Sequence, residues 1–223
     1  SLTSVTIGNS VTSIGSFAFH YCDSLTDVYY NGTQEQWTVI TIKDYNDALL
    51  NATIHYSGVT KTGWALEGGK WYYYQNGAKV TGWILDAGKW YFMDNSGVMQ
   101  TGWVLTGGKW YYMNSSGVMQ TGWLQDGGTW YYLNASGAMA TGWQQVGSTW
   151  YYFKSSGAMV TGWLQQGSVW YYLNSSGAMV TGWLQVGSTW YYFKSSGAMA
   201  TGWLQVGSTW YYFKSSGAMV TGW

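Results

Sequence analysis

Large apolar residues recur in a fixed order over most of the chain. From Thr62 onward, blocks such as "TGWLQVGSTWYYFKSSGAMV" (201–220) follow one another with small changes. The Trp of TGW returns every 20 residues at Trp83, Trp103, Trp123, Trp143, Trp163, Trp183, Trp203 and Trp223, and Trp64 is one residue out of step. A constant period of this kind is typical of repeat architectures. The pattern gives eight complete units over 62–220 and the start of a ninth.

Each unit has the pattern of a β-hairpin. A short segment such as TGWLQ leads into a turn rich in Gly and Ser, and a segment of β-prone residues such as TWYYF follows. A linker such as KSSGAM joins the next unit, and its glycine, for example Gly157, can adopt positive φ. Glycine recurs too often for a stable helix. Because one such hairpin cannot bury its apolar face, the units are predicted to stack into a mainly β solenoid.

Strand alternation assigns the side chains of a unit to two faces. In the unit 121–140, Leu124, Tyr131 and Leu133 share one face, which is predicted to be the core side. The two tryptophans lie with Tyr132 on the other face, which also carries the polar Gln125. This second face is predicted to stay partly open, so stacking alone does not explain its aromatic residues.

Composition removes several classes of function. The chain of 223 residues holds 18 Trp and 21 Tyr, and its formal net charge is zero. Because phosphate binding needs clustered cations, a nucleic-acid partner is not expected. No apolar run approaches the roughly 18 residues of a membrane span. Ser1 begins within a pattern, without a signal peptide, so a piece of a longer protein is expected. The single cysteine, Cys22, excludes an intramolecular disulfide.

An open aromatic face without acidic residues suits a quaternary ammonium ligand. From Gly127 to the end there is no Asp or Glu, so cations would have to be recognised by rings. Each ring contact is worth about 0.5–2 kcal/mol. Two or three contacts give about 3–5 kcal/mol, which corresponds to a dissociation constant near the millimolar range. Repetition along the chain would add avidity for a polymer that carries many such groups.

The stretch "TGWLQDGGTWYYLNASGAMATGW" (121–143) resembles the choline-binding, or cell-wall-binding, repeats of bacterial surface proteins and lysins. The resemblance implies a left-handed β-solenoid with choline sites between consecutive hairpins. Each site would take both tryptophans of one repeat and a tyrosine of the next, beside the Met of the first repeat's GxM. The alternation of the strands favours the last Tyr of WYY.

Carried onto this chain, the rule gives six expected sites. Their aromatic residues are Trp83, Trp90 and Tyr112; Trp103, Trp110 and Tyr132; Trp123, Trp130 and Tyr152; Trp143, Trp150 and Tyr172; Trp163, Trp170 and Tyr192; and Trp183, Trp190 and Tyr212. The methionines, in the same order, are Met99, Met119, Met139, Met159, Met179 and Met199. A site on Trp64 and Trp71 is left out of this set, because Phe92 replaces the last Tyr of the next unit and Lys79 replaces the Met.

Three functions remain open at this stage. The first is a non-catalytic module that binds choline, or choline-bearing teichoic acid, on a secreted protein at the bacterial cell surface; a homodimer is conceivable. The second is a polysaccharide-binding module of the glucan-binding type. The third is an adhesin whose N-terminal part binds a protein partner.

Residues 1–57 form a different module. Leu2 and Leu25, and likewise Val5 and Val28, are 23 residues apart, and "SIGSFAFHYCDSL" (13–25) resembles the BspA-like leucine-rich repeats of bacterial surface proteins. The segment after it is predicted to be a terminal cap. Thr33 with Gln36 predicts a capping box that opens a helix over Trp37, DALL predicts a second helical turn, and ATIHY predicts a strand. The predicted domains are 1–57 and 62–223, with a junction over 58–61.

No catalytic, metal or cofactor site is predicted. His20 and His55 have no metal-ligand spacing, and Cys22 occupies a position expected to be packed. Asp44 and Asp47 fall in a polar turn. The serine pairs, such as Ser155 and Ser156, have no base at a fixed spacing and are interpreted as turn residues. The chain is therefore not expected to be an enzyme.

Overall fold

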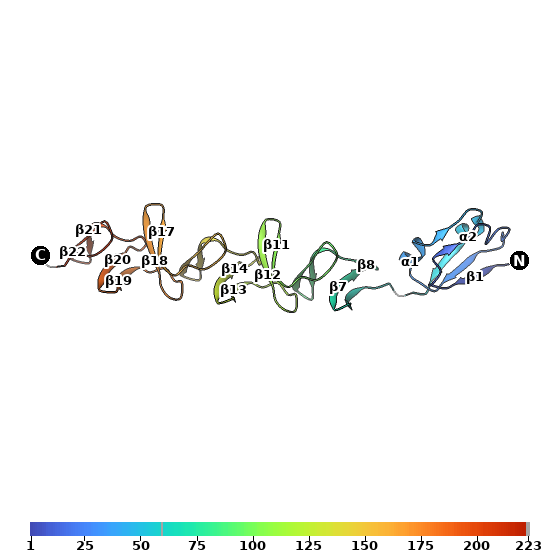
Figure 1. Ribbon diagram of the computed structural model, residues 1–223, viewed down its shortest axis with the longest axis horizontal. Helices are drawn as coiled ribbons and strands as arrows, with labels where there is room; N and C mark the ends of the chain where they lie inside the picture. Colours follow the sequence, from blue (N-terminus) through green and yellow to red (C-terminus); the bar gives the residue numbers. More distant parts are fainter. Residues whose placement is uncertain (59, 222–223) are drawn as a thin grey trace. The chain divides into compact units, whose positions relative to one another are not determined.

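The computed structural model describes residues 1–58 and 60–221, which form two compact units, Ser1–Gln100 and Thr101–Trp223 (Figure 1). Unit 1 contains the non-repetitive segment and the first hairpins, and unit 2 contains the later hairpins. The predicted junction over 58–61 includes residue 59, which lies outside the described residues, so the predicted domain division stays a prediction.

Residues 1–58 fold around a small parallel sheet. Strand β3 (Asp27–Tyr30) lies between β1 (Ser4–Ile7) and β5 (Thr53–Tyr56), and a second parallel pair joins β2 (Ser13–Ile14) to β4 (Thr41–Ile42). Val5 is paired with Val28 across β1 and β3. The 23-residue spacing in the sequence therefore reflects the pairing of equivalent residues on adjacent parallel strands.

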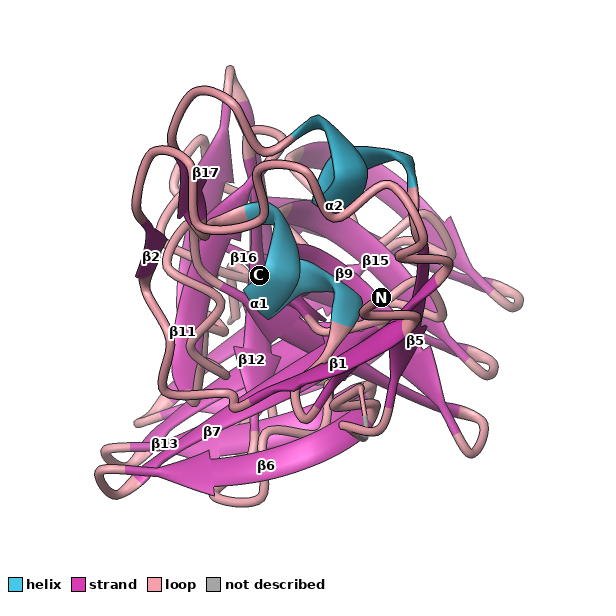
Figure 2. Ribbon diagram, turned by 90° about the vertical axis from the view of Figure 1, so that its right-hand side faces the viewer, coloured by secondary structure: helices cyan, strands magenta, loops and turns pink. Residues whose placement is uncertain are grey.

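Two short helices complete this segment (Figure 2). Helix α1 (Gln34–Thr38) begins with the predicted capping box, in which Thr33 accepts a hydrogen bond from the backbone of Gln36 and the Gln36 side chain accepts one from Thr33. Helix α2 (Asp47–Asn51) includes the predicted DALL turn and contributes Leu49, which is fully buried in the core with Val28. Among the described residues, neither helix has the length and apolar character of a membrane span.

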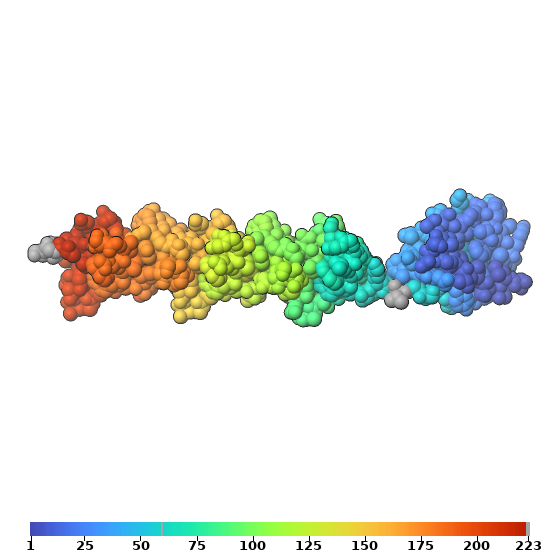
Figure 3. Space-filling view, turned by 60° about the horizontal axis from the view of Figure 1, so that its bottom comes forward, coloured from blue at the N-terminus to red at the C-terminus, as the bar shows by residue number. Residues whose placement is uncertain are grey.

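The repeats form hairpins, as the sequence pattern predicts. The first is a three-stranded sheet of β6 (Gly63–Glu67), β7 (Lys70–Gln75) and β8 (Ala78–Lys79). The two-stranded hairpins that follow are β9 (Gly82–Asp86) with β10 (Lys89–Met93), β11 (Gly102–Thr106) with β12 (Lys109–Met113), β13 (Gly122–Asp126) with β14 (Thr129–Leu133), β15 (Gly142–Val146) with β16 (Thr149–Phe153), β17 (Gly162–Gln166) with β18 (Val169–Leu173), β19 (Gly182–Val186) with β20 (Thr189–Phe193), and β21 (Gly202–Val206) with β22 (Thr209–Phe213). Within unit 2 the hairpins succeed one another and project from its surface as separate ridges (Figures 1 and 3).

The register within each hairpin fixes which rings share a face. In β13–β14, Trp123 lies opposite Tyr132 and Gln125 lies opposite Trp130, whereas Leu124 lies opposite Tyr131. Successive residues point to opposite sides, so the two tryptophans and Tyr132 lie on one face and Tyr131 on the other. The face assignment made from the sequence is therefore the observed one.

The core of the repeats is a row of residues that end the second strand of each hairpin. Their side chains are fully buried: Met93, Met113, Leu133, Phe153, Leu173, Phe193 and Phe213. Each forms an antiparallel bridge with the methionine of the following linker, as Leu133 does with Met139. The prediction that Leu133 lies on the core side is confirmed.

The linker strand connects neighbouring hairpins in unit 2. The backbone N–H of Met139 donates to the carbonyl oxygen of Trp110 in the preceding hairpin at 2.8 Å. The N–H of Ala140 donates to the backbone carbonyl oxygen of Tyr132 in its own hairpin, also at 2.8 Å. The same cross-hairpin bond joins Met159 to Trp130 and Met179 to Trp150 at 2.8 Å. The linkers that contain Met139, Met159 and Met179 are thus hydrogen-bonded to two hairpins, and these bonds set the register between the hairpins.

The linker glycine is required by both conformation and space. Gly157 has φ +80°, and a Cβ at this position would overlap the side chain of Met139 from the preceding linker. Gly162, at the start of the next unit, has φ +79° but would meet nothing within 4 Å. The two glycines therefore share their backbone conformation and differ in their surroundings.

We expect Gly157→Ala to destabilise the chain more than Gly162→Ala. Positive φ costs an alanine about 1–2 kcal/mol at either position. A Cβ at residue 157 must also displace the flexible thioether of Met139, which adds up to about 1 kcal/mol at this position alone. Denaturant unfolding of the two variants measures the difference, and equal free energies of unfolding would contradict the packing of Met139 against this glycine.

Candidate functional site: aromatic slots between successive hairpins

Three rings from two hairpins of unit 2 form an open slot. In β11–β12 the ring planes of Trp103 and Trp110 lie at 85°, with centroids 6.5 Å apart. Tyr131 of the next hairpin lies 4.8 Å from Trp103 at an interplanar angle of 62°. Trp110 remains 41% exposed, so the rings are walls of a space that solvent enters and are not sealed core.

Parts of three consecutive repeats line this slot. Met139 comes from the same repeat as Tyr131, and Ser155 and Ser156 come from the linker of the repeat after it. The volume of about 270 Å³ is slightly below the range for small-molecule sites, roughly 300–1,000 Å³. No acidic side chain is among the residues that line it. The slot is therefore small, mostly aromatic, and supplied with hydroxyl groups on one side.

The same arrangement recurs along unit 2. A slot of about 300 Å³ is lined by Trp143, Trp150, Tyr171, Met179, Ser195 and Ser196. Another of about 380 Å³ is lined by Trp163, Trp170, Tyr191, Met199 and Ser216. The ring contact that defines the slot is also present between Trp123 and Tyr151 and between Trp183 and Tyr211, with 4.7 Å between centroids in both pairs.

The tyrosine in each slot differs from the one expected. The slot on Trp103 and Trp110 contains Tyr131, whereas Tyr132 lies 5.2 Å from Trp123 within its own hairpin. Five further tyrosines that were predicted for slots also pack edge-to-face against the first Trp of their own hairpins: Tyr112, Tyr152, Tyr172, Tyr192 and Tyr212.

Strand alternation explains why Tyr131, and not Tyr132, lines the slot. A slot between two stacked hairpins is bounded by opposite faces of the two hairpins, so its tyrosine must come from the face that does not carry the tryptophans. The expectation placed all three rings on equivalent faces. Tyr131, which the sequence analysis assigned to the core side, is the residue that faces the preceding hairpin.

The methionines also belong to slots other than those predicted. Met139 was expected beside Trp123 and Trp130 but lines the slot of Trp103 and Trp110; Met179 and Met199 are displaced by one repeat in the same way. The cause is the hydrogen bond from the Met139 N–H to the Trp110 carbonyl, which carries each linker back to the preceding hairpin. The bonds from Met99 to Trp71 and from Met159 to Trp130, both 2.8 Å, follow the same rule. A Cβ at Gly137 would overlap Met119, which packs against the next linker.

The first hairpin has the slot geometry that the sequence argued against. Trp64 and Trp71 lie 6.4 Å apart at 83°, and Tyr91 lies 4.7 Å from Trp64. Phe92, the substitution for which this site was left out, packs on Trp83 in its own hairpin, with 5.1 Å between ring centroids. The Phe at this position therefore does not remove a slot residue.

Two further hairpins carry the same pair of tryptophans. Trp83 and Trp90 are 6.2 Å apart at 87° in β9–β10. In β21–β22, Trp203 and Trp210 are each 58% exposed. Trp223 lies outside the described residues.

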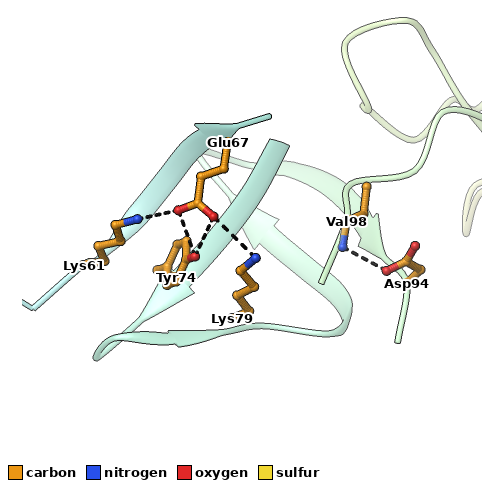
Figure 4. Close-up of polar contacts among 6 residues, drawn as sticks. All are labelled: Lys61, Glu67, Tyr74, Lys79, Asp94 and Val98. Atoms are coloured by element: carbon orange, nitrogen blue, oxygen red, sulfur yellow. Dashed lines mark hydrogen bonds and ion pairs between the residues drawn. The ribbon is translucent and has the colours of Figure 1, made fainter. Parts of the chain in front are cut away.

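A network of charged and polar side chains lies on the first hairpin, around Glu67 (Figure 4). Glu67 pairs with Lys61, accepts hydrogen bonds from the Tyr74 hydroxyl at 2.9 and 3.1 Å, and lies 3.4 Å from the ammonium of Lys79. The same Lys79 ammonium lies 3.4 Å from the centroid of Tyr72. Tyr72 is at the repeat position of the slot tyrosine Tyr91, so the protein's own cation lies against this ring.

The network shifts the pKa of Glu67 well below its ordinary value. The hydrogen bond from Lys61 is the largest cause, the Tyr74 hydroxyl adds to it, and together they lower the pKa to about 2 from 4.5. A depressed carboxyl pKa stabilises the fold fully above pH 4.5, and that contribution is lost as the pH falls toward about 2.

We expect Lys61→Met to raise the pKa of Glu67 toward 4.5, and Lys79→Met to raise it less, because the Lys61 hydrogen bond is the dominant cause. Carboxyl-carbon NMR titration of Glu67 in the full chain measures both shifts. A Glu67 that already titrates near 4.5 in the parent chain would show that the network does not form in solution.

The residues considered for other chemistry lie in the N-terminal segment. His55 contacts Asp27 at 2.7 Å, and this hydrogen bond lowers the pKa of Asp27. His20 lies beside Tyr21, with ring centroids 3.9 Å apart, and Cys22 packs against the segment's core. Among the described residues, no three His, Cys, Asp or Glu side chains are grouped as metal ligands.

Comparison with protein families matches most of the repeats. The model described as a choline-binding repeat matches residues 80–113, 100–142, 140–181 and 180–223. A second model, described as a cell wall binding repeat, matches residues 62–77. Among curated protein sequences, none matched the chain.

Solved structures from Streptococcus pneumoniae have the same fold. CbpJ is 49% identical with a TM-score of 0.67, and 72% of this chain covers 58% of that chain. Choline-binding protein F is 48% identical with a TM-score of 0.66 at the same coverages. The choline-binding domain of CbpL is 30% identical with a TM-score of 0.50, and 74% of this chain covers all of it. The chain thus spans 58% of the length of the first two relatives, and it belongs to the choline-binding repeat family.

Proposed function

We propose that each slot binds the trimethylammonium group of one choline. The observation that carries this proposal is the set of rings around the slot on Trp103 and Trp110, closed by Tyr131, with no acidic residue lining it. A methylated ammonium is large and weakly hydrated, and it is attracted to the faces of such rings by about 0.5–2 kcal/mol per contact. Ring walls alone therefore suffice for a cation of this kind.

The remaining slot residues suit the rest of a choline unit. Met139 provides a polarizable apolar surface for the methyl groups. Ser155 and Ser156 bring hydroxyl groups to the same slot, where they can hydrogen-bond to the oxygen end of choline. The serines, interpreted from the sequence as turn residues only, thereby gain a second role.

Several weak slots favour a polymeric ligand. Three ring contacts correspond to a dissociation constant near the millimolar range for a single slot. Unit 2 contains at least three such slots, so a polymer that carries many cholines can occupy several at once and gain avidity. A choline-bearing teichoic acid of the bacterial wall has these properties. The chain would then hold a secreted surface protein on the cell wall without catalysing a reaction.

The N-terminal segment fits the end of a BspA-like leucine-rich repeat domain with its cap. Support comes from the parallel pairing of Val5 with Val28 and from two short helices over the same core, the first of which begins with a capping box. The segment has its own buried core around Val28 and Leu49, so choline binding is assigned to the hairpins alone. A protein partner for this segment and a homodimer of the chain remain predictions from the sequence.

Retention on immobilised choline tests the proposed ligand. We expect the full chain to bind the resin and to elute with free choline but not with dextran. A chain that lacks residues 1–57 should behave in the same way. Elution by dextran would favour the polysaccharide alternative, and retention that depends on residues 1–57 would contradict the assignment to the hairpins.

Substitution of adjacent tyrosines tests the slot assignment. Tyr131→Leu removes a wall of the slot on Trp103 and Trp110. We expect choline affinity there to fall about 5- to 30-fold, which corresponds to the loss of about 1–2 kcal/mol from one ring contact. Tyr132→Leu is the matched control, because this ring packs inside its own hairpin. Titration followed by the indole N–H NMR signal of Trp103 compares the two, and a larger loss in Tyr132→Leu would support the original expectation instead.

A further inference from the structure

The slots are not chemically identical, because two of them have a carboxylate behind an indole. The indole N–H of Trp103 donates to Oδ2 of Asp126 at 2.9 Å, and that of Trp64 donates to Oδ2 of Asp86 at 2.9 Å. In both cases the aspartate belongs to the following hairpin and ends its first strand. The two contacts are repeats of one arrangement, in unit 2 and in unit 1 respectively.

Strand alternation places Asp126 on the side of the slot. Asp126 lies opposite Thr129, two residues from Leu124, which lies opposite Tyr131. Asp126 and Tyr131 are therefore on the same face, the one that meets Trp103. The carboxylate is not among the residues that line the slot, but it accepts a hydrogen bond from the indole of Trp103, which does line it.

A negative charge in this position acts on a bound cation in two ways. It attracts the ammonium directly through the partly solvated protein, and its hydrogen bond draws the indole N–H dipole outward and enriches the ring in electrons. For charges separated by about the width of an indole ring in partly solvated protein, direct attraction corresponds to a change of roughly three- to tenfold in affinity. A neutral ligand of the same shape gains nothing from either effect.

Most other repeats lack this charge. The positions that follow Asp126 at the repeat period are Val146, Gln166, Val186 and Val206. Val186, for example, occupies the position relative to the slot on Trp163 and Trp170 that Asp126 occupies relative to Trp103. The repeats thus provide natural charged and uncharged versions of one site.

We propose that Asp126 and Asp86 are specificity-determining residues that make the slots on Trp103 and Trp64 the high-affinity, charge-selective sites of the chain. This inference rests on the proposed function, because it concerns the same slots and a cationic ligand. It adds that the slots are graded: occupancy by choline begins at these two, and the later uncharged slots, such as that on Trp163, fill at higher concentration.

The full chain and two variants test this grading. Asp126→Asn keeps an oxygen acceptor for the Trp103 indole and removes the charge, and Val186→Asp adds a charge at the slot on Trp163. Choline and its neutral carbon isostere, in which carbon replaces nitrogen, are titrated while the indole N–H NMR signals of Trp103 and Trp163 report each slot separately.

We expect Asp126→Asn to weaken choline about three- to tenfold at Trp103 and to leave the slot on Trp163 unchanged. Val186→Asp should strengthen choline at Trp163 by a similar factor, and the isostere should respond to neither change. Equal losses for choline and the isostere would assign Asp126 a purely structural role, and unchanged choline affinities in both variants would also overturn the inference. Failure of the proposed function is distinct, because choline would then shift neither signal in the parent chain.

Discussion

One backbone hydrogen bond determines how neighbouring repeats meet. Within unit 2, the N–H of the linker methionines from Met139 onward donates to the carbonyl oxygen of the second tryptophan in the preceding hairpin, which is Trp110 for Met139. This bond fixes the register between hairpins, because the linker is already bonded to its own second strand. It brings Tyr131 to Trp103 and places Met139 at the slot, so a repeated backbone contact builds a repeated side-chain site.

The slots stay open because stability is supplied elsewhere. The residues that end the second strands, such as Leu133 and Phe153, are fully buried and bridge to the linkers. The tryptophans of each hairpin instead meet edge-to-face, an arrangement that leaves their faces free on one side. A nearest-neighbour architecture of this kind repeats both functions, packing and ligand recognition, at every unit.

The sequence was sufficient for the hairpins, because period, glycine turns and alternation are local properties. It also separated the buried Leu133 from the open tryptophan face. It failed on the contacts between hairpins. The sequence of one repeat does not show that Met139 returns to the preceding hairpin, or that a slot combines opposite faces of two hairpins. For this reason the sequence predicts Tyr132 at the slot, where the structure has Tyr131. The indole bond of Asp126 to Trp103 is likewise an interaction between repeats that no single repeat reveals.

A crystal structure of the chain with choline would show whether the aromatic slots between hairpins are the binding sites. We expect a trimethylammonium group enclosed by Trp103, Trp110 and Tyr131, with Met139 beside its methyl groups and the hydrogen bond from Met139 to Trp110 retained. Choline bound against Tyr132 on the face of a single hairpin, or slots that remain empty at saturating choline, would contradict it.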